Sequence, residues 1–156
     1  MKGIVMSIKL SHFGVCVSDL DAALRFYCDG LGFAKGASFN KGNEFKPVLE
    51  VEGDIDLTSM FITRDGFTVE LSYYKSPGTH GTPHSSRNHL GVTHMTYHVT
   101  GLPALIEKLE SCGGTVVEEA RMSVANPDGS SIELVFVADP DGNRLELMEQ
   151  VPAATG

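Results

Sequence analysis

Two histidines and two glutamates are the residues of this sequence whose types and spacing best suit chemistry. Each stands in a segment with the alternating pattern of a β-strand: His12 and Glu70 in the first half of the chain, His94 and Glu146 in the second. Because side chains alternate between the faces of a strand, all four lie opposite the apolar residues of their own segments. Two imidazoles and two carboxylates suit a divalent cation and leave positions for water or substrate. The sequence therefore predicts one metal ion, Ni, Co, Zn, Mn or Fe, held by these four residues.

The same pattern has a second explanation. A sheet with one packed face and one wet face carries polar residues on the wet face whether or not they bind anything. The order His then Glu occurs in both halves of the chain, and chance would have to place both residue types at equivalent positions twice. The repetition therefore favours the metal site, whereas a single histidine or glutamate of this kind would not.

A strand, a short helix and a glycine stop occur twice in the chain, and they would position the histidines. The first set is a strand over 8–17 and a helix that Ser18 opens with a capping-box-like pattern. The second set is a strand over 92–99 and a helix that Thr100 caps, with Pro103 in its first turn. The two histidines thus fall in equivalent strands of an internal repeat.

The glutamates belong to a second repeated unit, a pair of strands joined by an Asp-Gly turn. The pairs are 57–62 with 67–74, and 131–138 with 143–149. Asp-Gly between two strand-like runs is a hairpin signal. One more strand per half, near 34–38 and 114–121, gives each half the order β-α-β-β-β.

The predicted fold class is therefore α+β, with two βαβββ modules forming an open mixed β-sheet cup. The first module covers residues 7–75 and the second covers residues 92–150. Residues 76–91, rich in Gly, Pro, Ser, Thr and His, form a linker or active-site loop. Residues 39–53 are expected to form a second loop.

The composition of the chain excludes some classes of binding partner. The chain has 156 residues and a net charge of -8, so it has no obvious attraction to nucleic acid or to an anionic membrane. Its three cysteines are odd in number and widely spaced, which does not indicate a disulfide framework. No apolar run is long enough to span a membrane. We expect a cytoplasmic protein that acts on a small molecule.

Four stretches of the sequence resemble the vicinal oxygen chelate superfamily, which includes glyoxalase I, methylmalonyl-CoA epimerase, extradiol dioxygenases and the fosfomycin and bleomycin resistance proteins. The stretches are HFGVCVSDLDAALRFYCDGLGF (12–33), VELSYYKSPG (69–78), NHLGVTHMTYHV (88–99) and DPDGNRLELME (139–149). The resemblance implies that paired modules form a cup around a metal at the four positions above. It also implies that the cup is completed within one chain or between two chains, often in a homodimer.

A His/Glu/His/Glu set looks most like glyoxalase I and the epimerases, which transfer a proton next to a metal-chelated carbonyl of a small oxygenated substrate. By similarity, Glu146 is the first candidate for the catalytic carboxylate and Glu70 is the second. His98, Tyr74 and Arg144 share faces with these residues and are candidate pocket residues. The resemblance thus implies a lyase or isomerase.

The sequence also departs from the family. Cys16, Tyr74 and Leu90 stand where glutathione-dependent glyoxalase I usually has Arg, Asn and Arg. The side chains that would grip the carboxylates of glutathione are therefore missing, and glutathione dependence is not expected.

Three other functions stay open. His12, His94 and Glu146 make a two-His-one-carboxylate set that suits an Fe(II) extradiol-type dioxygenase, although Glu70 is not usual there. The second is a non-catalytic protein that binds an antibiotic or another small molecule, although such proteins usually lose the ligand set. A fosfomycin-type thiol transferase is weaker, with Arg144 as its only candidate cation.

Overall fold

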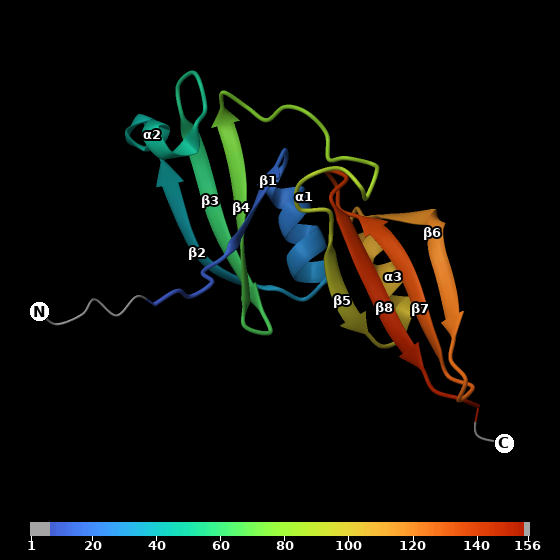
Figure 1. Ribbon diagram of the computed structural model, residues 1–156. Coiled ribbons are helices and arrows are strands. Elements are labelled where there is room, and N and C mark those ends of the chain that lie inside the picture. The colour runs from blue at the N-terminus through green and yellow to red at the C-terminus, as the bar shows by residue number, and fades with distance from the viewer. Residues whose placement is uncertain (1–6, 155–156) are drawn as a thin grey trace, which may run out of the picture.

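The computed structural model describes residues 7–154, and within them the chain folds as two similar modules (Figure 1). The elements of the first module are β1 (Phe13–Val17), α1 (Leu20–Leu24), η1 (Arg25–Gly30), β2 (Ala34–Lys41), η2 (Asn43–Phe45), α2 (Lys46–Leu49), β3 (Asp56–Arg64) and β4 (Phe67–Ser76). The elements of the second are β5 (Met95–Val99), α3 (Leu102–Ser111), β6 (Thr115–Ala125), β7 (Ser131–Ala138) and β8 (Arg144–Val151). The sheet orders are β1-β4-β3-β2 and β5-β8-β7-β6. The predicted α+β fold with two βαβββ modules is confirmed.

In each module the first strand runs parallel to the last, and this pairing sets the faces of the sheet. Gly14 lies opposite Glu70 on the neighbouring strand, and Thr96 lies opposite Glu146. The strands begin later than the sequence suggested, so that His12 and His94 each stand one residue before β1 and β5. By this alternation, the side chain of each histidine lies on the same face of the sheet as the glutamate of its own module.

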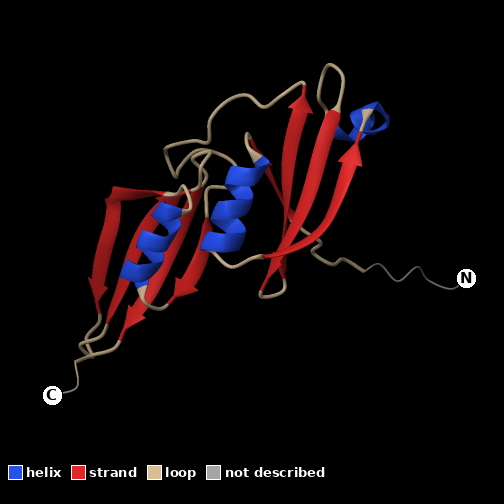
Figure 2. Ribbon diagram, turned by 180° about the vertical axis from the view of Figure 1, so that it is seen from behind, coloured by secondary structure: helices blue, strands red, loops and turns tan. Residues whose placement is uncertain are grey.

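The opposite faces of both sheets pack against the helices and form one core. Figure 2 shows α1 and α3 lying along the sheets, with α1 in the middle of the molecule. The fully buried side chains include Phe26, Leu71, Leu109, Leu145 and Leu147. Burying each such side chain stabilises the fold by about 1.5–3 kcal/mol. Since this core contains residues of both modules, the modules pack against each other and do not form two separate cores.

Close packing at the junction of the modules depends on glycine. A Cβ atom at Gly114 would lie 2.6 Å from Cε2 of Phe26, and one at Gly30 would lie 3.0 Å from Cδ2 of Leu109. A buried hydrogen bond, 2.9 Å from the Tyr27 hydroxyl to the Asp139 carboxylate, also joins the two modules. Burial and then the charge of Asp139 raise the pKa of Tyr27, so the phenol stays protonated and can donate.

The helix starts differ from the sequence predictions. Asp19, not Ser18, is the N-cap of α1, and its carboxylate accepts a 2.9 Å hydrogen bond from the amide of Ala22. Ser18 instead donates to the carboxylate of Asp141 in the second module. The N-cap of α3 is Gly101, whose positive φ of 71° suits glycine, and Thr100 makes no cap.

The connection between β2 and β3, predicted as a loop, contains the two short helices η2 and α2. The side-chain carbonyl of Asn43 accepts a 2.8 Å hydrogen bond from the amide of Ile55, which closes this connection on itself. The Lys41 ammonium lies 5.8 Å from the centre of the Phe45 ring. This insertion therefore holds the end of β2, and with it Lys41, over the sheet.

No helix within the described residues 7–154 is long and apolar enough to cross a membrane.

Candidate metal centre

His12 and Glu70 form the first of two half-sites. The Nε2 atom of His12 lies 3.1 Å from Oε2 of Glu70, and the two side chains are 35% and 12% exposed. The other ring nitrogen, Nδ1, hydrogen bonds to the Ser11 hydroxyl at 2.9 Å. The ring edge packs against Phe61, with 5.2 Å between ring centres. These contacts fix the imidazole with one nitrogen directed at the carboxylate.

His94 and Glu146 form the second half-site in the same manner. Nε2 of His94 lies 3.8 Å from Oε2 of Glu146, and its Nδ1 hydrogen bonds to the Thr93 hydroxyl at 2.8 Å. The ring packs edge-on against Phe136 at 5.3 Å. In both half-sites, then, the residue before the histidine orients the ring and a phenylalanine of the third strand supports it. Support of this kind is typical of metal-ligating histidines.

The two glutamates differ in their partners. The Lys41 ammonium lies 2.9 Å from Oε1 of Glu70. Burial acts to raise the pKa of Glu70, but the nearby Ser59 hydroxyl, the hydrogen bond from Lys41 and the charges of Lys41 and His12 outweigh it and lower that pKa. Glu146 accepts a 2.8 Å hydrogen bond from the Thr96 hydroxyl. Glu146 therefore has a neutral hydrogen-bond partner where Glu70 has a charged one.

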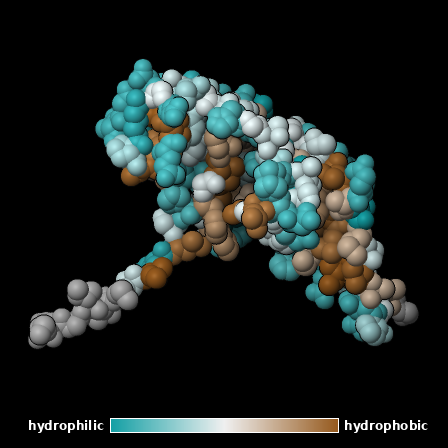
Figure 3. Space-filling model, turned by 45° about the horizontal axis from the view of Figure 1, so that its top comes forward, coloured by the Kyte–Doolittle hydropathy of each residue, from teal (hydrophilic) through white to brown (hydrophobic). Residues whose placement is uncertain are grey.

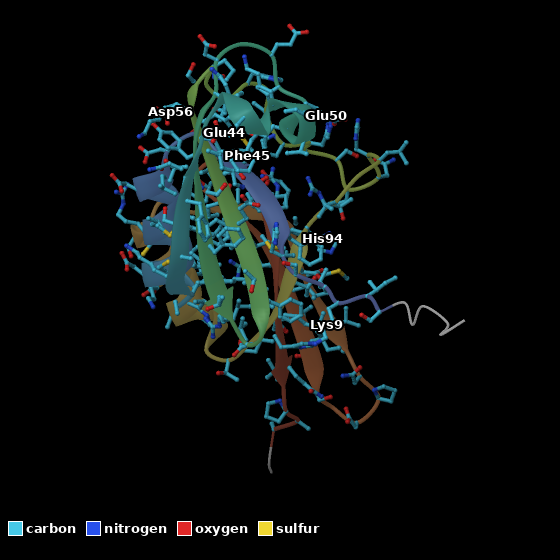
Figure 4. The ribbon with its side chains drawn as sticks, turned by 90° about the vertical axis from the view of Figure 1, so that its left-hand side faces the viewer. Lys9, Glu44, Phe45, Glu50, Asp56 and His94 are labelled. Atoms are coloured by element: carbon cyan, nitrogen blue, oxygen red, sulfur yellow. The ribbon has the colours of Figure 1, made fainter. Side chains whose placement is uncertain are left out.

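The two half-sites do not meet within one chain. Across residues 7–154, no place brings together three or more His, Cys, Asp or Glu side chains that could hold a metal ion. Each half-site lies on its own sheet, and Figure 4 shows His94 well apart from Glu44, Phe45 and Glu50 around α2. The donor types fit a divalent metal, but each module supplies only two of them. The prediction that all four residues surround one metal ion within a single chain is therefore wrong.

The other predicted pocket residues lie in three different places. Tyr74 is half-buried on the face of Glu70, opposite Leu57. His98 is exposed and lines a cavity between the modules that does not reach His94. Arg144 lines a different cavity, of about 560 Å³, together with His94. Only Arg144 therefore shares a cavity with a predicted metal ligand.

Sequence reasoning missed the supporting residues. Phe61 lies opposite Glu70 and Phe136 lies opposite Glu146, so the internal repeat carries a signal for both phenylalanines. Lys41 has no such signal, because it stands at the end of a strand that is longer than the sequence predicts, and it has no counterpart in the repeat.

The model of one protein family matches residues 9–147 of the chain, and that family is described as the Glyoxalase/Bleomycin resistance protein/Dioxygenase superfamily. No curated protein sequence matches the chain.

Solved structures share the fold. A glyoxalase family protein from Bacillus cereus is 20% identical, with 95% of this chain and 97% of that chain covered and a TM-score of 0.75. The trypanothione-dependent glyoxalase I of Leishmania major is 20% identical, with 92% and 87% covered and a TM-score of 0.59. A mutant of glyoxalase I from Zea mays is 22% identical, with 88% of this chain and 43% of that longer chain covered and a TM-score of 0.60. At these identities the likeness concerns the fold alone. The family match, which spans most of the chain, goes further: this protein belongs to the Glyoxalase/Bleomycin resistance protein/Dioxygenase superfamily.

Proposed function

We propose that the protein is a metal-dependent lyase or isomerase of the glyoxalase I type, which moves a proton next to a carbonyl of a small oxygenated substrate. The observation that carries this proposal is the pair of equivalent half-sites, each with a histidine Nε2 directed at a glutamate of the same sheet face. Four such groups, two imidazoles and two carboxylates, would balance the charge of a divalent ion.

The complete centre would form between two copies of the chain. His12 and Glu70 of one copy would face the second half-site of the other, so that a symmetric dimer holds two identical centres. The open sheet faces support this, because they expose apolar side chains on the same faces as the half-sites: Phe39 and Met122 are each 54% exposed, and Val124 is 39% exposed. Figure 3 shows apolar surface on both arms of the molecule. Apolar patches of this kind mark association surfaces.

The protein groups divide the chemistry between them. A bound divalent ion would supply a Lewis acid that polarises the carbonyl. Glu146 would take and return the proton, because its hydrogen-bond partner is the neutral Thr96 hydroxyl at 2.8 Å. Glu70 would serve as a ligand through Oε2, the oxygen that faces His12, and not as a base, because Lys41 holds its other oxygen at 2.9 Å.

Substitution of Glu146 by Gln tests the proposal. We expect E146Q to keep the wild-type circular dichroism spectrum but to lose deuterium incorporation from D2O into 2-oxo acids and acyl thioesters by at least about 100-fold. Metal content, measured by elemental analysis, should fall as well. The control is E118Q, since Glu118 lies on β6 and pairs with Arg121 away from both half-sites. An E146Q protein with full metal content and full exchange activity would refute the assignment.

One observation favours a second function, an Fe(II) extradiol-type dioxygenase. If Lys41 keeps its 2.9 Å ion pair with Glu70, then Glu70 is not available as a ligand. His12, His94 and Glu146 would remain as a two-His-one-carboxylate set for Fe(II). Oxygen uptake with a catechol under Fe(II), without deuterium exchange into carbonyl compounds, would select this function.

A further inference from the structure

The linker between the modules covers a cavity of about 560 Å³ beside the second half-site. Residues of this linker form one wall, and the ends of β1, β5 and β8 form the others. Figure 1 shows the linker passing over α1 on its way from β4 to β5. His94 lines the cavity, so a molecule in this cavity would lie beside one predicted metal ligand. The volume suits a small-molecule ligand.

Two arginines, Arg87 and Arg144, line this cavity. They lie close enough to act on each other: desolvation first, and then the charge of Arg144, lower the pKa of Arg87. Neither is paired with a carboxylate within residues 7–154, whereas Arg64 and Arg121 each pair with a neighbouring acidic side chain. In a chain with a net charge of -8, two uncompensated cations in one cavity call for an anion.

Arg87 is held firmly in place. Its guanidinium donates to the backbone carbonyls of His84 and Thr93, and its Cζ lies 6.0 Å from the centre of the Phe136 ring. The same phenylalanine supports His94. These partners orient the guanidinium without neutralising it, and they fix its position relative to the candidate ligand.

The acidic residue on the cavity wall does not cancel this charge by direct contact. The Asp141 carboxylate accepts hydrogen bonds from the amide and the hydroxyl of Ser18. Arg144 donates to the carbonyl of Gly142 at 2.9 Å. The remaining donors of Arg144 are therefore free for a ligand, since a guanidinium carries five N–H groups in a planar fork.

We propose that Arg87 and Arg144 bind an anionic group of the substrate, a carboxylate or a phosphate, while its carbonyl end lies at the metal centre. This inference rests on the proposed function for the identity of the ligand as a substrate. The anion site itself depends only on the two arginines and the cavity. Bidentate hydrogen bonding from guanidinium groups is the usual way in which proteins recognise these anions.

The test measures anion binding without activity. Inorganic phosphate and, separately, succinate are titrated into ¹⁵N-labelled protein at constant ionic strength, and the Nε–Hε signals of the arginines are followed by NMR. We expect saturable shifts of the Arg87 and Arg144 signals. R144Q should weaken binding at least about tenfold, whereas R121Q, which changes an arginine paired with Glu118, should bind like the wild type. The tighter of the two probes identifies the kind of anion.

R87K is a second variant that keeps the positive charge of Arg87. It should retain part of the anion binding, which would show that a loss of binding is not caused by a disturbed linker. Equal affinity in the wild type and R144Q, or no saturation with either probe, would overturn the inference. H12A separates it from the proposed function, since this variant should lose metal and still bind the anion. A wild-type protein that binds phosphate at the arginine pair but takes up no metal would support the anion site and refute the metal centre.

Discussion

A single lysine decides how alike the two half-sites are. His12 and His94 have matching surroundings, with a hydroxyl on Nδ1 and a phenylalanine against the ring. The glutamates do not match, because only Glu70 carries an ammonium group at 2.9 Å. The charge that Lys41 adds makes Glu70 more acidic, and it also repels any cation that approaches.

Replacement of Lys41 by Met should therefore tighten metal binding. We expect K41M to lower the dissociation constant for Ni or Zn roughly tenfold at low salt, and less at high salt, because screening weakens the repulsion. Isothermal titration calorimetry measures the effect. K75M is the control, since Lys75 is exposed on β4. Weaker metal binding by K41M would mean that Lys41 positions Glu70 rather than competing with the metal.

At the scale of elements, a strand caps a helix. Glu149 near the end of β8 accepts hydrogen bonds from the amides of Gly101 and Leu102 at the start of α3, the latter at 3.2 Å. A carboxylate at this position satisfies amides that have no partner inside the helix and favours the positive end of its dipole. The cap thus fastens the helix layer to the strand that carries Glu146.

Loss of this cap should cost stability. We expect E149A to lower the free energy of unfolding by about 1–2 kcal/mol, measured by urea denaturation. T100A, which changes the residue that the sequence indicated as the cap, should stay within about 0.5 kcal/mol of the wild type. A larger loss in T100A than in E149A would show that the cap lies one residue earlier than in the structure described above.

At the scale of the whole molecule, two half-sites on separate sheets make the arrangement of copies a functional question. Within one chain the modules share a core through the helices, and the His/Glu faces point away from that core. A second copy can therefore approach an open face without disturbing the packed layer. The proposed centre then depends on whether the first module of one copy packs against the second module of the other.

Complementation between two inactive variants tests whether the centre forms between two copies of the chain. One chain carries H12A and E70Q, and the other carries H94A and E146Q. If the centre forms between copies, neither variant binds metal alone. Their refolded mixture should then regain about a quarter of the wild-type metal content, because half of randomly formed dimers contain one intact centre. Elemental analysis measures the recovery. No recovery in a mixture that forms dimers would refute a centre formed between copies.

The sequence by itself determined the modules and the faces of their strands. The repeated order of strand, helix and hairpin predicted the βαβββ fold, and the alternation along four strands put His12, Glu70, His94 and Glu146 opposite the core. These features are local, so spacing along the chain is enough to reveal them. Both predicted helix caps were wrong by one residue. For α3 the reason is that its first amides donate to Glu149, which is distant in sequence, whereas for α1 the neighbouring Asp19 caps in place of Ser18.

Only the tertiary structure decided which of these residues meet. It joined the modules through their helices, so that the two His/Glu pairs lie apart, and it brought Lys41 to Glu70 and Arg87 to the wall beside His94. Such contacts link segments whose separation along the chain follows no period. They depend on how the packed layers and the linker fill space, which the pattern of residue types along one strand does not record.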